Sequence, residues 1–356
     1  MTKKARQADT VNEPSEGAVG RRVTMDKLAE LAGVHKSTVS RALRPGTTFY
    51  QSPTAQRIRA IADSVDFQPD RYAASLRTRR TGTIGVLVPR LSDNLQAVFY
   101  ESVVRACTSQ DIVALVAVTG DDPVAEQHAA NALLGRRVDG LILTSTRVNG
   151  EYPAQLAQRD VPYVLALRHN GTDHSCVVSD DRAGGYLVTQ HLLELGHRRI
   201  GIIAGPDHAS TAVGRRQGFM DAHRDAGVSV EPDLVHKSMF RWQDGYDIAT
   251  KWLSSANPPT AIFAVNDEMA FGVVAAAQTR GLDLPGELSI VGYNDIPSAA
   301  RPPMPLTTAR MDIGALARAA VDSLRARIDG EQTANRTIPV TLVVRKSSAP
   351  PSFSAR

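Results

Sequence analysis

The stretch VHKSTVSRAL, residues 34–43, carries side chains that donate hydrogen bonds at a helical spacing. At 100° per residue, its donors fall within an arc of roughly 140°, and they are Lys36, Ser37, Ser40 and Arg41. The apolar residues of the stretch lie on the opposite side of the helix, and they are Val39, Ala42 and Leu43. Ammonium, hydroxyl and guanidinium groups bind phosphate oxygens and base edges. We therefore predict a helix that packs with one face and contacts nucleic acid with the other.

A further helix is predicted immediately before this one, in VTMDKLAELAG. Thr24 is its expected N-cap and Gly33 its terminator. Its apolar side is expected to consist of Leu28, Leu31 and Ala32. Two short helices that meet at a glycine form the helix-turn-helix pattern, whose second helix enters the major groove of DNA. The alternative interpretation is an ordinary helical hairpin exposed to solvent.

The formal net charge of +4 is unevenly distributed along the chain. Residues 21–81 contain 12 Lys and Arg against 5 Asp and Glu, whereas residues 1–20 are balanced and the rest is mildly acidic. This asymmetry is typical of a nucleic-acid-binding module joined to a module with another task.

Further elements are expected around the two helices. Residues 1–22 are polar and are predicted to be disordered. A third helix is expected to begin at Ser52 and Pro53, an N-cap and first-turn pair, and to run through about Asp63. The following stretch, QPDRYAASLRTRRTG, is interpreted as a linker with a helical middle.

From Thr83 onward, short β-branched runs alternate with longer amphipathic segments. The runs expected to be strands are 83–88, 112–118, 140–145, 162–167, 199–204, 260–265, 288–293 and 337–344. The expected helices include 123–134, 182–195, 212–226, 243–255 and 267–280. This alternation predicts an α/β fold of two doubly wound parallel-sheet halves. Ligands of such folds bind at the carboxyl ends of strands, so the cleft between the halves is the expected site.

Length and composition exclude several classes. A chain of 356 residues is long enough for more than one domain. It has no apolar run of membrane-spanning length and no signal segment, so we expect a cytoplasmic protein without a membrane partner. Cys107 and Cys176 are isolated and are expected to be buried thiols, not parts of a disulfide or a zinc site.

Enzyme signatures are missing from the sequence. His191 and His197 are about 240° apart on a helix and so do not form the metal pair of HExxH, and Asp180 and Asp181 suit a strand-to-helix crossover. The GxSxG, GxxxxGK[ST] and GxGxxG patterns do not occur. We expect no enzyme activity, no cofactor and no metal. The competing class is a solute-binding protein, which would use the same cleft but would carry an export signal and no basic segment.

Eight stretches between Val23 and Lys346 resemble, in order, the LacI/GalR family of transcriptional regulators. They are VTMDKLAELAGVHKSTVSRAL, SLRTRRTGTIGVLVP, RRVDGLIL, HLLELGHRRIGIIAGP, RRQGF, AIFAVNDEMAFG, SIVGYNDIP and PPMPLTT. The resemblance implies a helix-turn-helix headpiece, a hinge helix and a core like that of periplasmic sugar-binding proteins. It further implies a homodimeric repressor that binds palindromic double-stranded operator DNA under the control of a small-molecule effector.

The resemblance also implies which headpiece residues contact DNA. Lys36, Ser37 and Arg41 stand at base-reading positions, and Arg41 has the geometry for a bidentate contact to guanine. Phosphate contacts are expected from Thr38 and Ser40, and Thr24 is a further expected DNA-binding residue. Leu76 stands at the position of a minor-groove wedge, with Arg77 beside it for a phosphate. The alternative is that Leu76 packs on the core.

In the cleft, the resemblance implies an effector site made by Ser92, Asp93, Arg168, Arg215, Phe240 and Asp267. Arg215 would act as a forked donor, Asp267 as an acceptor from hydroxyls and Phe240 as a ring face. Alternatively, Arg215 and Asp267 form a structural ion pair and Phe240 belongs to the core. Leu95 and Gln96 replace the paired aromatics common in the family after the first-strand loop, and Leu167 replaces the usual Asp before Arg168. These departures remove a stacking surface and a hydroxyl acceptor while keeping positive charge, and so favour a carboxylated or phosphorylated effector over a neutral sugar.

The predicted domain limits complete the expectations. They are a headpiece at 23–69, a hinge and linker at 70–81, a core at 82–348 and a disordered tail at 349–356. Within the core, one subdomain is expected at about 82–167 plus 305–330, and the other at about 168–304 plus 331–348. The tail has no leucine heptads, so we expect a dimer without a tetramerising coiled coil.

Overall fold

The computed structural model describes residues 23–43, 48–67, 80–171, 175–301 and 303–352. The chain divides into two compact units at Arg79 and Arg80, which we call the headpiece and the core. The predicted disordered residues 1–22, the hinge helix with Leu76 and Arg77, and residues 353–356 lie outside the described part of the chain.

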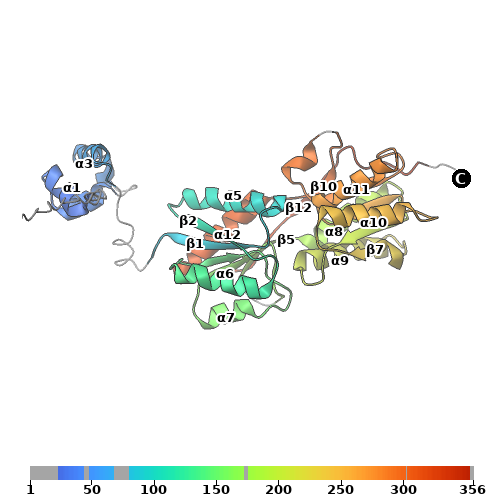
Figure 1. Cartoon of the computed structure of the whole chain (residues 1–356), viewed down its shortest axis with the longest axis horizontal. Coiled ribbons are helices and arrows are strands. Elements are labelled where there is room, and N and C mark those ends of the chain that lie inside the picture. Colours follow the sequence, from blue (N-terminus) through green and yellow to red (C-terminus); the bar gives the residue numbers. More distant parts are fainter. Residues whose placement is uncertain (1–22, 44–47, 68–79, 172–174, 302, 353–356) are drawn as a thin grey trace, which may run out of the picture. The chain divides into compact units, whose positions relative to one another are not determined.

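The headpiece is a small bundle of helices, shown in blue in Figure 1. Its elements are α1 (Met25–Ala32), α2 (Lys36–Ala42), the 3₁₀ helix η1 (Thr48–Gln51) and α3 (Pro53–Ser64). Both predicted N-caps are present: Thr24 accepts from the Lys27 N–H at 3.2 Å, and Ser52 accepts from the Ala55 N–H at 3.2 Å. Gly33 ends α1 in the left-handed region, with φ of 64°.

One packing prediction in the headpiece is wrong. Leu31 is 47% exposed, whereas Ala29, which the prediction omitted, is buried beside Leu28 and Ala32. Leu31 lies at the edge of the apolar stripe of α1, and the small bundle does not reach it. The remaining headpiece core comes from α2 and α3 and consists of Val39, Ala42, Ala55, Ile58 and Ala62.

The core contains two six-stranded sheets. The first has the order β11-β5-β4-β3-β1-β2 and is entirely parallel. Its strands are β1 (Thr83–Val88), β2 (Val113–Val118), β3 (Leu141–Leu143), β4 (Tyr163–Ala166), β5 (Cys176–Ser179) and β11 (Arg336–Ile338). The second has the order β12-β10-β9-β8-β6-β7, and only β12 runs antiparallel to its neighbour. Its strands are β6 (Ile200–Ala204), β7 (Val235–Lys237), β8 (Ala261–Ala264), β9 (Ser289–Asn294), β10 (Thr307–Met311) and β12 (Val340–Val343).

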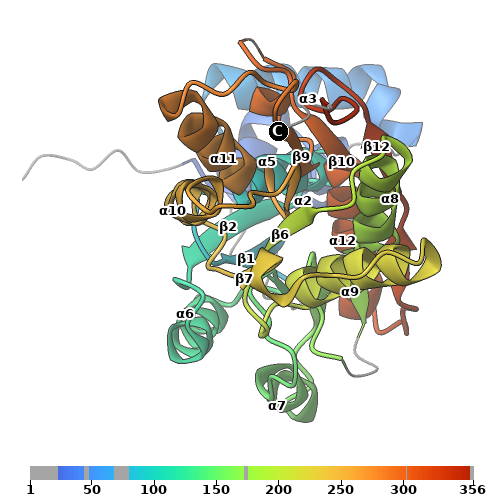
Figure 2. The ribbon, with the colours of Figure 1, turned by 90° about the vertical axis from the view of Figure 1, so that its right-hand side faces the viewer.

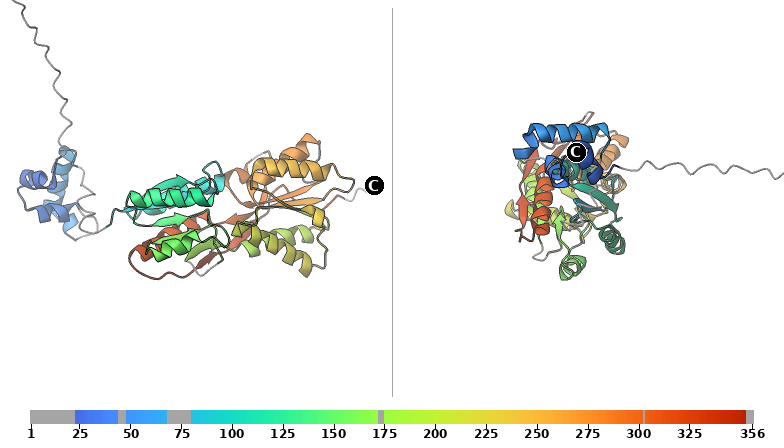
Figure 3. Two further views of the ribbon diagram at one scale, coloured as in Figure 1. Left: turned by 60° about the horizontal axis from the view of Figure 1, so that its bottom comes forward. Right: turned by 90° about the vertical axis from the view of Figure 1, so that its left-hand side faces the viewer.

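Helices cover both faces of each sheet, as the βα alternation predicts. The first sheet is flanked by α5 (Asn94–Thr108), α6 (Pro123–Gly135), α7 (Tyr152–Gln158) and α12 (Ile313–Ile328). The second carries α8 (Asp181–Glu194), α9 (Ser210–Asp225), α10 (Trp242–Leu253) and α11 (Asp267–Thr279). Figure 2 shows β6 between the α8–α9 pair and the α10–α11 pair, and Figure 3 shows the helix layers of the core from another direction. The short 3₁₀ helices η2 (Pro232–Leu234) and η3 (Pro297–Ala300) complete the core.

The subdomain limits differ from the prediction because the chain crosses between the sheets three times. It passes from β5 to α8, from β10 to α12 and from β11 to β12. Strand β10 therefore belongs to the second subdomain, whereas β5 and β11 belong to the first. The predicted single strand 337–344 is split at Pro339, because proline lacks the N–H that a continuous ladder needs.

The two ends of the core also lie outside the predicted limits. Thr81 donates its N–H to Asp139 at 2.7 Å, and Arg80 pairs with Asp329, so both residues belong to the core and not to a linker. At the other end, Ala349 is not part of a disordered tail, because its carbonyl accepts from Ser289 Oγ at 2.9 Å. Among the described residues, none of the helices combines the length and the apolar character that a membrane span requires.

Buried histidines make the stability of the core dependent on pH. His197 Nε2 lies 2.9 Å from the Ala349 carbonyl, and burial lowers the pKa of His197 below 6.5. The folded state therefore keeps a neutral ring, while the unfolded chain gains a proton near pH 6.5. The stabilisation is complete above that pH and is lost as the pH falls.

We expect wild type to lose more stability than His197→Gln between pH 7.5 and 5.5, by at most about 1.4 kcal/mol for each pH unit below 6.5. The measurement is urea unfolding of the full chain at both values. His236→Gln, at an exposed histidine, is the matched control and should follow wild type. Equal losses in all three proteins would contradict a neutral buried ring.

Candidate functional site

A small cavity of about 30 Å³ lies between the two subdomains of the core. Its lining residues come from both sheets and from one crossover, and they are Asp93, Leu95, Gln96, Leu167, Arg168, Thr211, Arg215, Phe240, Asn266, Asn294 and Met311. Most of them follow the carboxyl ends of parallel strands, which is where the fold places ligands. The cleft predicted from the sequence is therefore present.

Four of the six predicted effector residues line this cavity, and they are Asp93, Arg168, Arg215 and Phe240. The other two lie elsewhere. Ser92 is exposed to solvent, and Asp267 is fully buried behind the cavity wall. The two oxygens of Asp267 already accept from Thr308 Oγ1 at 2.6 Å and from the Ile296 N–H at 2.9 Å. Burial raises the pKa of Asp267 to about 7, although these two hydrogen bonds act to lower it.

Arg215 is held in a buried ion pair at a crossover between the subdomains. Its Nε donates to Asp181 at 2.8 Å, and its Nη1 donates to the Val265 carbonyl at 2.6 Å. Its guanidinium also lies 3.7 Å from the centre of the Tyr293 ring. The suggested pair between Arg215 and Asp267 is therefore wrong, because Asp181 is the partner.

Two glycines bring α8 and α9 close enough to form this pair. A Cβ at Gly185 would lie 2.1 Å from the Arg215 carbonyl oxygen, and one at Gly218 would lie 2.0 Å from that of Arg182. Only glycine permits this approach of two helix backbones. The packing places Arg215 beside the first turn of α8, where Asp181 lies.

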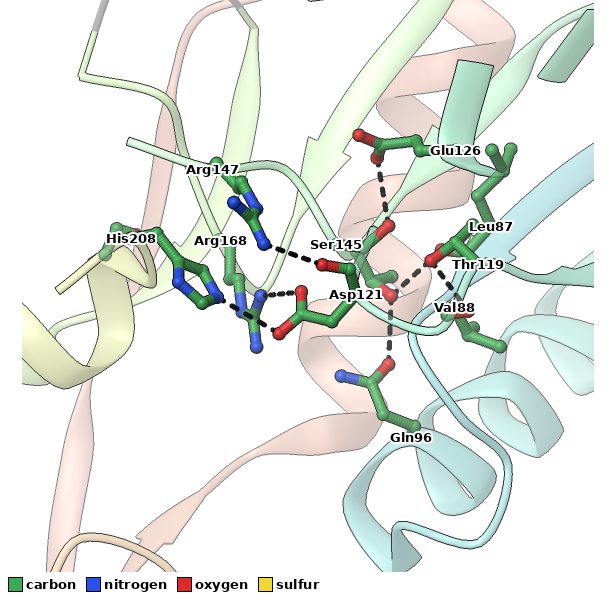
Figure 4. A network of polar contacts seen from close by, with 12 residues as sticks. Leu87, Val88, Gln96, Thr119, Asp121, Glu126, Ser145, Arg147, Arg168 and His208 are labelled. Carbon is green, nitrogen blue, oxygen red and sulfur yellow. Dashed lines mark hydrogen bonds and ion pairs between the residues drawn. The ribbon is translucent and has the colours of Figure 1, made fainter. Parts of the chain in front are cut away.

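Arg168 has a carboxylate partner of its own. Its Nη1 donates to Asp121 Oδ1 at 2.7 Å, and both side chains are less than a tenth exposed. His208 Nε2 approaches the other oxygen of Asp121 at 3.2 Å. Figure 4 shows the Arg168 and His208 side chains converging on Asp121. Burial works to raise the pKa of Asp121, but Arg168 and His208 outweigh it, and the pKa is lowered.

These pairs remove the basis for the predicted anionic effector. The prediction relied on positive charge at Arg168 and Arg215, and each guanidinium is compensated by a buried carboxylate. The cavity also contains Asp93. Burial raises the pKa of Asp93, and this effect outweighs the hydrogen bond from the Leu95 N–H and the charge of Arg90, which both lower it. The described lining therefore offers no uncompensated cation.

Hydrogen bonds join the subdomains around the cavity. His208, after β6, is bound to Asp121, after β2, and its carbonyl accepts from the Val148 N–H at 2.9 Å. Asn94, at the start of α5, is hydrogen-bonded to Glu268 in α11. These contacts close the cleft over the lining residues.

Backbone strain and an unsatisfied acceptor mark the cavity as a built site. Leu167 and Phe240 have φ of 64° and 65°, which is costly for bulky residues and concentrates at functional sites. Asn294, which is 4% exposed, has an Oδ1 without a hydrogen-bond partner among the described residues. Such an acceptor in a cavity wall suits a hydrogen-bond donor on a ligand.

The sequence analysis missed Asn266, another residue of the cavity lining. Its side-chain amide caps α11, and it could have been recognised in the sequence as the residue before Asp267.

In the headpiece, the four predicted donors of α2 are exposed, and they are Lys36, Ser37, Ser40 and Arg41. Thr38 is half-buried, and Thr24 caps α1. His35 acts as the N-cap of α2, since its Nδ1 accepts from the Ser37 N–H at 3.3 Å. Lys36 is paired with Asp26 at 2.8 Å, so a contact to DNA would have to replace this ion pair.

The fold and the site define a class of protein. A cleft between two doubly wound subdomains is the architecture of ligand-binding proteins of the periplasmic type, and residues 189–348 match the model of a periplasmic binding protein-like domain. In this chain the same polypeptide also carries three short helices arranged as a helix-turn-helix module.

Curated relatives and solved structures define the family. The HTH-type transcriptional repressor PurR of Haemophilus influenzae (strain PittEE) is 32% identical over 330 residues, which are 91% of this chain and 98% of the relative. The lac repressor dimer bound to operator and the anti-inducer ONPF has a TM-score of 0.81 and 26% identity, covering 92% of this chain and 100% of that one. A LacI transcriptional regulator from a Rhodococcus species has a TM-score of 0.68 and 32% identity, covering 75% and 98%. The chain belongs to the LacI/GalR family of transcriptional regulators, and its relatives are repressors.

Proposed function

We propose that the protein is a repressor that binds a palindromic operator as a homodimer and is controlled by a small effector in the cleft of the core. The observation that carries the proposal is the division of α2 into two faces. Val39 and Ala42 are buried in the headpiece, while the donor face around Arg41 is exposed. The lac repressor, whose structure is a dimer bound to operator, supports the assembly by analogy.

The effector is proposed to be a small uncharged molecule with several hydrogen-bonding groups. The Oδ1 of Asn294 calls for a donor, and Asp93 is a further acceptor in the lining. Phe240 offers a ring face for apolar C–H groups. A related structure, the transcriptional regulator CelR, is a complex with cellobiose. A sugar-like polyol is therefore the class we would test first.

The proposed control acts through closure of the cleft. An effector that prefers one degree of closure shifts the population of the core toward it. In a dimer, this shift would change the distance between the segments that follow the two headpieces, so that both headpieces fit or miss their half-sites. Leu76 and Arg77, in the segment outside the described residues, keep their proposed roles as wedge and phosphate contact.

Selection of bound sequences from a random DNA pool tests the DNA-binding function. We expect the full chain to enrich a sequence with two-fold symmetry and to lose affinity steeply as salt rises. A solute-binding protein, the competing class, would enrich no sequence.

Arg41→Ala tests the proposed role of the α2 face. Loss of a bidentate contact to guanine should cost about 1–3 kcal/mol and relax the preference at one position in each half-site. The measurement is the affinity for the selected operator and its single-base variants. Lys27→Ala, at an exposed α1 lysine paired with Glu30, is the control and should change the preference little. A uniform loss on all sequences would assign Arg41 to phosphate.

A further inference from the structure

Asp121 is a buried carboxylate directly behind the wall of the effector cavity. It follows β2, has φ of 63° and holds its backbone carbonyl 2.9 Å from Arg147 Nη2. Its side chain is 5% exposed and reaches Arg168 from behind the cavity wall. The described lining includes Arg168 but not Asp121.

We propose that Asp121 is a specificity-determining residue, the fixed counter-ion of Arg168 that makes the cavity reject anionic effectors. The inference rests on the proposed function of the cleft. A guanidinium binds a carboxylate, sulfate or phosphate through parallel N–H donors. At Arg168 one of these donors is already given to Asp121 at 2.7 Å, and its charge is compensated there.

The surrounding charges strengthen this argument. The side chains that face Asp121 are Arg168, from the end of β4, and His208, from the loop after β6. Glu126 of α6 and the guanidinium of Arg147 are close enough to influence the charges of this cluster. An anionic ligand at Arg168 would bring a second negative charge next to Asp121 in a buried site, and like charges placed together are costly. The second guanidinium of the cavity, that of Arg215, is equally compensated by Asp181.

Asp121→Asn should convert the cavity into an anion site. The amide keeps the size of the side chain and an oxygen for Arg168, but it removes the negative charge. The probe is inorganic sulfate, measured by calorimetric titration of the full chain at constant ionic strength. We expect the variant to bind sulfate about tenfold to a hundredfold more tightly than wild type. This gain in affinity corresponds to the usual contribution of one charge-assisted hydrogen bond.

Matched variants locate the effect. Asp225→Asn removes an exposed carboxylate at the end of α9 and should leave sulfate binding as in wild type. Adding Arg168→Met to Asp121→Asn should abolish the gain, because the guanidinium is the proposed ligand. Asp121→Ser removes the same charge and replaces Asp121→Asn if that variant does not fold.

The inference is overturned if a cooperatively folding Asp121 variant gains no sulfate binding, or if wild type binds sulfate as tightly as the variant. Wild type alone gives a second test: it must not bind glucose 6-phosphate better than glucose, or ribose 5-phosphate better than ribose. The operator affinity of each variant is measured in parallel. If the proposed function is wrong, the protein will show no sequence-specific binding to DNA in this assay, whether or not it binds sulfate.

Discussion

Arg215→Ala is expected to lower the free energy of unfolding of the core by about 3–5 kcal/mol. The guanidinium is 2% exposed, and its removal leaves Asp181 buried without a compensating charge. Burial already raises the pKa of Asp181 in spite of Arg215. The variant also loses the donor to Val265 and the contact with the Tyr293 ring. The measurement is urea unfolding of the full chain at pH 7.5.

The same helix pair supplies the control. Arg182 pairs with Asp221 at 2.6 Å, but its side chain is 63% exposed, so Arg182→Ala should cost less than about 1 kcal/mol. Replacing Arg215 by Met and Asp181 by Leu together should recover much of the loss, because no isolated charge remains. If Arg215→Ala and Arg182→Ala lower the free energy of unfolding by the same amount, the buried pair of Arg215 and Asp181 does not stabilise the crossover.

Asp267→Asn is expected to make the core more stable than wild type at pH 8 and to remove a pH dependence. The folded pKa of Asp267, about 7, is raised above the unfolded value of 3.8. Its contribution to stability is therefore complete below pH about 3.8 and is lost as the pH rises through 7. Wild type should lose about 1.4 kcal/mol per pH unit relative to Asp267→Asn across this interval. Unfolding at pH 5, 6, 7 and 8 measures the difference.

Effector affinity separates this structural role from the role predicted by resemblance. Both oxygens of Asp267 are bound within the protein, so Asp267→Asn should leave the affinity for an effector within about twofold. Asp267→Ala instead leaves Thr308 Oγ1 and the Ile296 N–H unsatisfied and should destabilise the core by about 2–4 kcal/mol. If a stably folded Asp267→Asn variant lost most of its affinity for the effector, Asp267 would contact the effector directly, as the resemblance implies.

Local patterns were sufficient to predict most of the fold. The caps at Thr24 and Ser52 and the apolar strands such as β1 act through neighbouring residues, and the structure confirms them. Strands β5, β7 and β10 were not predicted. They have three to five residues, and two of them contain polar residues at interior positions, so only their neighbours in the sheet make them strands.

The site was predicted in outline but not in its charges. Resemblance located Arg168 and Arg215 at the cavity, because a motif fixes the position of a side chain along its element. It could not supply their partners: Asp121 is 47 positions from Arg168, and Asp181 is 34 positions from Arg215. The net charge of a cavity depends on such long-range pairs, which explains why the sequence favoured an anionic effector.

Coupling between the cleft and the headpiece is the most direct test of the account. The measurement is the affinity of the full chain for its selected operator, by fluorescence anisotropy, with and without a polyol that stabilises the core in thermal unfolding. We predict a change of about 5- to 150-fold and, by linkage, the same factor in the affinity of the polyol for free and DNA-bound protein. A polyol that fills the cleft and binds both forms equally would contradict the account.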